Sequence, residues 1–135
     1  MEIIITKDKT LKTIQQEFAK RFPYLKIVFY SKEHLDGTGS HQENVLHNEQ
    51  TIEQVQKKES TGNIHIHGLL KVSELESAFS ESFGLPVQVF RQSGEIWLQT
   101  TTTDSLTLAE QNHIAMEKNR SNNGSTDQID YREQE

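Results

Sequence analysis

Residues 3–22 of this chain read IIITKDKTLKTIQQEFAKRF, and residues 64–83 repeat the same apolar pattern as IHIHGLLKVSELESAFSESF. Six apolar positions coincide at a spacing of 61 residues: Ile3/Ile64, Ile5/Ile66, Leu11/Val72, Ile14/Leu75, Phe18/Phe79 and Phe22/Phe83. The remaining positions differ. A duplicated fold leaves this pattern because burial restricts the inward-facing residues, whereas water tolerates many outward-facing ones. The sequence therefore predicts two equivalent repeats, at about residues 1–59 and 62–118.

Each repeat has the residue pattern of a strand followed by a helix and a second strand. Apolar residues spaced three and four apart indicate amphipathic helices, and short β-branched runs indicate strands. Strands are predicted at 2–6, 24–31, 63–67, 86–92 and 95–102, and helices at 10–22, 52–58, 72–83 and from Thr107 onward. Ser93-Gly94 is typical of a tight hairpin. Gln54 and Glu110 lie where they can complete capping boxes with Thr51 and Thr107.

The fold class that follows is α+β, built from two β-α-β-(β)-α units. We expect a mixed sheet with the helices mainly on one face. A strand, a helix and a strand joined by short links predict a parallel pair with a right-handed crossover. Residues 1–118 are interpreted as a single domain. Residues 119–135 are polar with few apolar anchors, which predicts a disordered tail.

Composition excludes several classes of site. The chain has 135 residues, no cysteine and a net charge of −6, so disulfides, zinc–thiolate sites and thiol nucleophiles are excluded. The acidic balance argues against general nucleic-acid binding. The N-terminal segment lacks a basic region and a long apolar run, and no stretch approaches the roughly 20 apolar residues of a spanning helix. A cytoplasmic protein without membrane contact is expected.

The best candidate for metal chemistry is the pair His65 and His67. Alternation along the strand places both imidazoles on one face, about 7 Å apart, where they can share a divalent metal. A third ligand is needed, and His34, His41 and His47 are near the intervening loop. The alternative is that both histidines cover a wetted face. Their counterparts in the first repeat, Ile4 and Thr6, show that the scaffold does not require them.

The second candidate is the sheet face that points away from the helices. If Leu25, Val87 and Ile96 point inward, alternation sends Val28, Tyr30, Phe90 and Trp97 outward. His65 and His67 are expected on the same face. The predicted binding surface comprises Tyr30, Phe90, Arg91 and Trp97. Apolar sheet faces are usually covered, so the two repeats, a second chain or a ligand could lie there. A stacking platform for single-stranded RNA is a further alternative.

The loop at 36–41, Asp-Gly-Thr-Gly-Ser-His, has two glycines that could let amides approach a phosphate. It lacks the Gly-Lys-Ser/Thr ending of a nucleotide-binding loop, so a turn is the simpler interpretation. No nucleophile elbow, HExxH helix or spaced carboxylate pair occurs. These patterns predict neither a catalytic site nor a cofactor.

Three segments resemble a set of small, uncharacterised bacterial α/β proteins: residues 22–26 (FPYLK), 83–98 (FGLPVQVFRQSGEIWL) and 107–112 (TLAEQN). The resemblance covers residues 1 to about 118. It implies a fold, but no activity and no catalytic residues, because that family has no assigned function. His65 and His67 lie outside the pattern that carries it.

The function expected from the sequence is a non-enzymatic interaction or regulatory module. It would bind a protein partner, or a second copy of itself, through the outward sheet face. The alternative is a small-ligand or metal-binding protein centred on His65 and His67.

Overall fold

The computed structural model describes residues 3–31, 45–59, 63–100, 103 and 105–121. Its elements, in chain order, are β1 (Ile3–Ile5), α1 (Leu11–Arg21), β2 (Leu25–Phe29), α2 (Ile52–Val55), β3 (Ile64–Ile66), α3 (Val72–Phe83), β4 (Val87–Ser93), β5 (Ile96–Gln99) and α4 (Leu108–Ser121). The α+β class is confirmed. The predicted loop at 36–41 lies outside the described residues.

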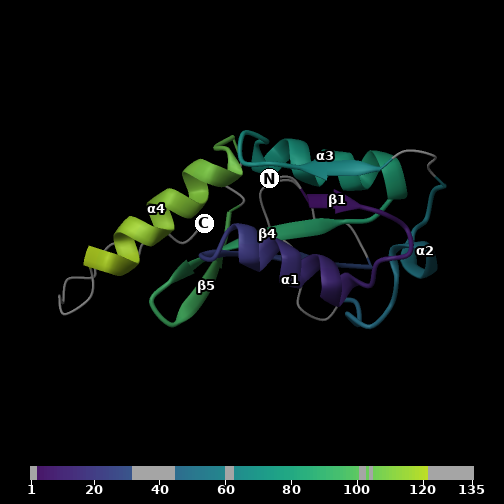
Figure 1. Ribbon diagram of the computed structural model, residues 1–135, viewed down its shortest axis with the longest axis horizontal. Coiled ribbons are helices and arrows are strands. Elements are labelled where there is room, and N and C mark those ends of the chain that lie inside the picture. The colour runs from purple at the N-terminus through teal and green to yellow at the C-terminus, as the bar shows by residue number, and fades with distance from the viewer. Residues whose placement is uncertain (1–2, 32–44, 60–62, 101–102, 104, 122–135) are drawn as a thin grey trace.

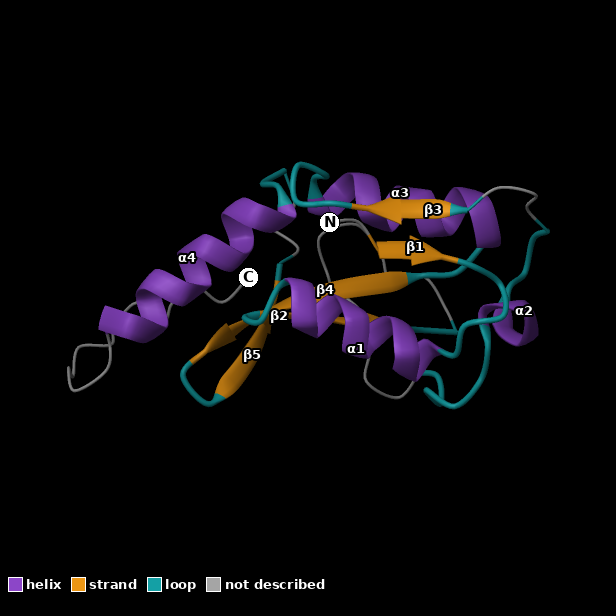
Figure 2. Ribbon diagram, viewed as in Figure 1, coloured by secondary structure: helices purple, strands orange, loops and turns teal. Residues whose placement is uncertain are grey.

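The strands form two antiparallel sheets, each of which takes strands from both halves of the chain. β1 pairs with β3, and β2-β4-β5 form a three-stranded sheet (Figure 2). The expected parallel pair of β1 and β2 is therefore wrong, and the described strands form no mixed sheet. β1 and β2 pair with their counterparts β3 and β4 from the other half, and β5 joins β4 as a hairpin. In each half, the strand that follows the long helix lies in the other sheet.

In both sheets, matching positions of the two predicted repeats lie opposite each other at the centre of the strand pair. The centre of the β1–β3 pair is Ile4 opposite His65, and the centre of the β2–β4 pair is Ile27 opposite Val89. Backbone hydrogen bonds recur in the same way, with Leu11 N–H donating to the Gln50 carbonyl and Val72 N–H to the Leu106 carbonyl. The two halves thus meet around a common axis. Their origin by duplication stays a prediction.

One continuous core lies between the two sheets and is flanked by α1 and α3. Figure 1 shows β1 apart from β4, with α1 in front and α3 behind. The core includes all six pairs of matched apolar residues. Phe79 of α3 packs edge-on against Phe29 of β2, with ring centroids 5.6 Å apart. Truncating a buried phenylalanine of this kind typically costs about 3–5 kcal/mol of stability.

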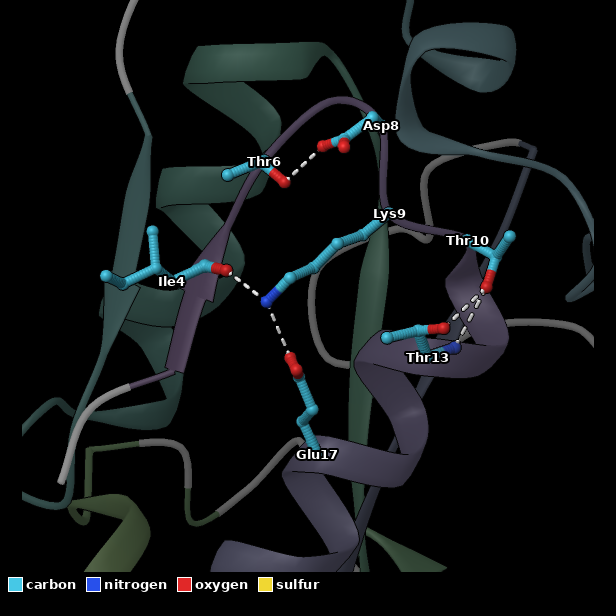
Figure 3. Close-up of polar contacts among 7 residues, drawn as sticks. All are labelled: Ile4, Thr6, Asp8, Lys9, Thr10, Thr13 and Glu17. Atoms are coloured by element: carbon cyan, nitrogen blue, oxygen red, sulfur yellow. Dashed lines mark hydrogen bonds and ion pairs between the residues drawn. The ribbon is translucent and has the colours of Figure 1, made fainter.

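The start of α1 is fixed by a polar network (Figure 3). The Thr10 hydroxyl accepts a hydrogen bond from the Thr13 N–H at 3.1 Å. Lys9 Nζ donates to the Ile4 carbonyl at 2.6 Å and pairs with Glu17 Oε1 at 2.7 Å. Because Ile4 belongs to β1 and Glu17 to α1, Lys9 links this strand to this helix.

Two further predicted helix starts are also observed, whereas α2, predicted over 52–58, ends at Val55. Thr51 with Gln54, and Thr107 with Glu110, form the two expected capping boxes. Gly84 ends α3 in the left-handed conformation, with φ of 61°. The predicted tail begins too early, because α4 continues to Ser121. The rest of that tail lies outside the described residues.

Candidate functional site

The outer face of the three-stranded sheet is set by strand alternation. Leu25, Ile27 and Phe29 of β2 are buried in the core, so Lys26 and Val28 point to the opposite side. Antiparallel partners share a face, and Lys26 lies opposite Phe90, which in turn lies opposite Gln99. Trp97 occupies the same face of β5 through its pairing with Gln92.

A half-open hollow of about 400 Å³ lies on this outer face. The described residues that line it are Lys26, Val28, Tyr30, Val45, Phe90, Trp97 and Gln99. They come from β2, β4 and β5 and from the bridge that joins Tyr30 to Val45. Three of the four residues predicted for the binding surface, Tyr30, Phe90 and Trp97, are therefore brought together.

Lys26 lies between the two aromatic rings of the hollow. Its Nζ is 4.8 Å from the centre of the Trp97 ring and 5.4 Å from that of Phe90. Both distances are within the range of cation–π attraction. Burial lowers the pKa of the Lys26 ammonium, because a charged group loses hydration there.

Tyr30 lines the hollow and is only 2% exposed. Burial raises its pKa to about 12, so the phenol stays protonated well into alkaline pH. A protonated phenol can donate a hydrogen bond. The hollow thus combines two polar donors, on Lys26 and Tyr30, with walls of aromatic and aliphatic carbon.

Arg91, the fourth predicted residue, does not line the hollow. It lies opposite Leu25 and Leu98 on the inward side of the sheet and is 4% exposed. One position along β4 is enough to reverse the direction of a side chain. Ile96 was expected to point inward, but it lies near the hairpin turn at Gly94 and is 58% exposed.

His65 and His67 lie apart from the hollow. His65 is on the exposed side of β3, opposite Ile4 in the two-stranded ribbon, so the expected common face with Trp97 does not exist. Within the described ranges, no group of three or more histidine, aspartate or glutamate side chains is placed to hold a metal. His34 and His41 fall outside those ranges. A metal site on this pair stays a prediction.

Alternation could have identified Lys26, because it places that residue on the same face as Val28. The sequence could not reveal how close the ammonium lies to both rings, because that depends on β2 and β5 flanking β4 in the sheet. Gln99 and Val45 were missed for the same reason.

No protein-family model, curated protein or solved structure matches the chain. No helix in the described part of the chain has the length and apolar composition needed to cross a bilayer. The chemistry of the hollow is therefore the main guide to function. It is suited to holding apolar groups on the rings and a polar group against Lys26 and Tyr30.

Proposed function

We propose that this protein is a non-enzymatic interaction or regulatory module that binds a protein partner through the hollow of the three-stranded sheet. The observation that carries the proposal is the clustering of Phe90, Trp97 and Val28 around the hollow, which has a volume of about 400 Å³. Aromatic side chains in a hollow are the usual anchors of protein recognition, because they bury much area at a small cost in conformational entropy.

The chemistry of the lining residues supports binding rather than turnover. A general base or a nucleophile paired with one would be expected in a catalytic hollow. The described lining offers instead an ammonium, a phenol with its pKa raised to about 12 by burial, and a side-chain amide. These groups orient a bound segment. Association of two copies through the same face is a second form of this function.

Trp97→Asp tests the proposal, with Ile96→Asp as the matched control. Ile96 is the neighbouring residue on β5, is exposed and does not line the hollow. Both variants add the same charge to the same strand. Proteins captured from a lysate of the source cells are identified, and the purified candidate is then titrated by calorimetry. Sedimentation velocity over a range of concentrations measures self-association of each variant.

Wild type and Ile96→Asp are expected to bind the purified partner, or to self-associate, with similar affinity. Trp97→Asp is expected to lose at least about tenfold, because the indole is removed and the introduced carboxylate can pair with Lys26 in place of a group of the partner. Equal binding by all three proteins would contradict the proposal. So would a wild-type protein that remains monomeric and captures nothing that Trp97→Asp does not.

A further inference from the structure

We infer that the hollow is selective for an acidic peptide segment of the partner, in which a carboxylate meets Lys26 and an adjacent apolar side chain packs on Trp97. The inference rests on the proposed function and adds the chemistry of the bound segment. It follows from the charge, the donors and the size of the hollow.

The charge of the hollow comes from Lys26. It is the one charged side chain among the described lining residues, and no acidic side chain in the described ranges forms an ion pair with it. Charged groups removed from water are normally paired with an opposite charge. The rings of Trp97 and Phe90 attract the ammonium at 4.8 and 5.4 Å, but they accept no conventional hydrogen bond. An anionic group of a bound segment would pair with this half-buried ammonium.

The number of charges favours a carboxylate over a nucleic acid. Phosphate backbones are bound by several lysines or arginines that neutralise successive phosphates. The described lining offers one ammonium among aromatic, aliphatic and uncharged polar side chains. A single carboxylate matches this charge and can accept hydrogen bonds from the ammonium.

Tyr30 supplies a second donor at the same surface. Its phenol lines the hollow together with Lys26, and no described residue hydrogen-bonds to its hydroxyl. Burial raises the pKa of this group to about 12, so it stays a donor well into alkaline pH. Tyr30 lies four residues along the backbone from Lys26, so its phenol is a donor for a second polar group of the bound segment and not for the carboxylate that meets Lys26.

The size of the hollow favours a short segment over a folded surface. A volume of about 400 Å³ lies at the lower end of the range found for small-molecule sites, about 300–1,000 Å³. A few side chains of a peptide fit such a space. The exposed faces of Trp97 and Phe90 are then available for the apolar side chain beside the carboxylate.

Two synthetic peptides test the inference on the full chain: acetyl-Gly-Asp-Phe-Asp-Gly-amide and its uncharged counterpart acetyl-Gly-Asn-Phe-Asn-Gly-amide. Trp97 is the only tryptophan, so its indole N–H signal in a nitrogen-15 NMR titration reports directly on the hollow. Titrations use wild type, Lys26→Met and Lys26→Arg. Methionine keeps a long apolar stem without charge, and arginine keeps the charge. Thermal unfolding confirms that each variant is folded.

Wild type is expected to bind the aspartate peptide about tenfold more tightly than the asparagine peptide. Lys26→Arg should retain most of this preference, and Lys26→Met should lose it. The inference is overturned if wild type shows no preference, if Lys26→Met keeps it, or if neither peptide shifts the Trp97 signal.

A Trp97→Asp variant distinguishes a hollow that lacks selectivity for acidic peptides from a hollow that binds no peptide at all. Its amides in β2 and β4 are followed with the same two peptides. If wild type binds both peptides equally and Trp97→Asp binds neither, the hollow is a docking site without acid selectivity. The inference then fails and the proposed function stands. If Trp97→Asp binds both peptides as wild type does, the peptides bind elsewhere and both fail.

Discussion

At the scale of single residues, Tyr30 lines the hollow although its side chain is almost completely buried. Burial raises its pKa to about 12, from an ordinary value of 10.0. Because the folded pKa is the higher one, protonated Tyr30 favours folding at every pH below 10. That contribution is lost as the pH rises from 10 through 12.

Tyr30→Phe should therefore change how stability depends on alkaline pH. Between pH 10 and 12, wild type is expected to lose up to about 2 kcal/mol of unfolding free energy relative to the variant. Denaturant unfolding at a series of pH values measures this difference, and comparison with the variant cancels the other tyrosines and lysines. Parallel pH profiles for the two proteins would show that Tyr30 ionises freely in the folded state.

Alternation was enough to predict that Tyr30, Phe90 and Trp97 point away from the core. The prediction of Arg91 on the same face was wrong because it departed from this rule, which places Arg91 inward when it is counted from Phe90. Lys26 was not predicted as a site residue, because a lysine on an outward strand position is usually solvated. Its significance depends on two rings contributed by residues 64 and 71 positions later.

At the scale of elements, the helices follow closely from local sequence. Predicted and observed bounds agree for α3, and the capping boxes at Thr51 and Thr107 are confirmed. A cap depends on neighbours along the chain, so sequence specifies it directly. Most strand ends were predicted too long by one to three residues, whereas β4 continues one residue beyond its predicted end, to Ser93, because a strand ends where its pairing partner ends.

The glycine at the end of α3 and the glycine in the β4–β5 turn share a left-handed backbone conformation but differ in their surroundings. Gly84 and Gly94 have φ of 61° and 64°, but an added Cβ at Gly84 would lie 3.1 Å from Lys57 Cβ, whereas Gly94 faces open space. Gly94→Ala is expected to cost about 1 kcal/mol through backbone strain alone. Gly84→Ala should cost about 2 kcal/mol or more, measured by denaturant unfolding.

Equal costs for the two substitutions would mean that the segment at Lys57 moves away without penalty. The α3 end would then not be fixed by its contact with this segment, where the Lys57 N–H donates to the Phe83 carbonyl at 2.7 Å.

At the scale of the whole molecule, the sequence predicted equivalent halves but not how they join. The spacing of apolar residues indicates which side chains are buried in the core, but it does not indicate which strands pair with each other. The pairing of β1 with β3 and of β2 with β4 requires contacts between residues about 60 positions apart. No local pattern carries that information.

If the two halves are equivalent, as the sequence predicts, residues of one half can replace those at the matching positions of the other. Lys9 and Glu17 form an ion pair in the first half, and the positions 61 residues later hold Leu70 and Ala78, which pack against the core. Lys9→Leu with Glu17→Ala is expected to keep the unfolding free energy within about 1 kcal/mol of wild type, because a half-exposed pair contributes little and leucine regains apolar contact.

Thermal and denaturant unfolding of the double variant measure this exchange, with Lys9→Leu alone as the control. A loss of more than about 3 kcal/mol in the double variant would contradict the equivalence of the two positions. It would assign to the Lys9 bond with the Ile4 carbonyl a structural role that the second half lacks.

The central claim is that the hollow beside Trp97 is open and positively charged in the isolated protein. Quenching of the single tryptophan by iodide and by caesium measures both properties at once. We predict efficient quenching by iodide, weaker quenching by caesium, and loss of that difference in Lys26→Met, because the ammonium attracts the anion to the ring. A Trp97 emission that neither ion quenches, or that caesium quenches more strongly, would contradict the account.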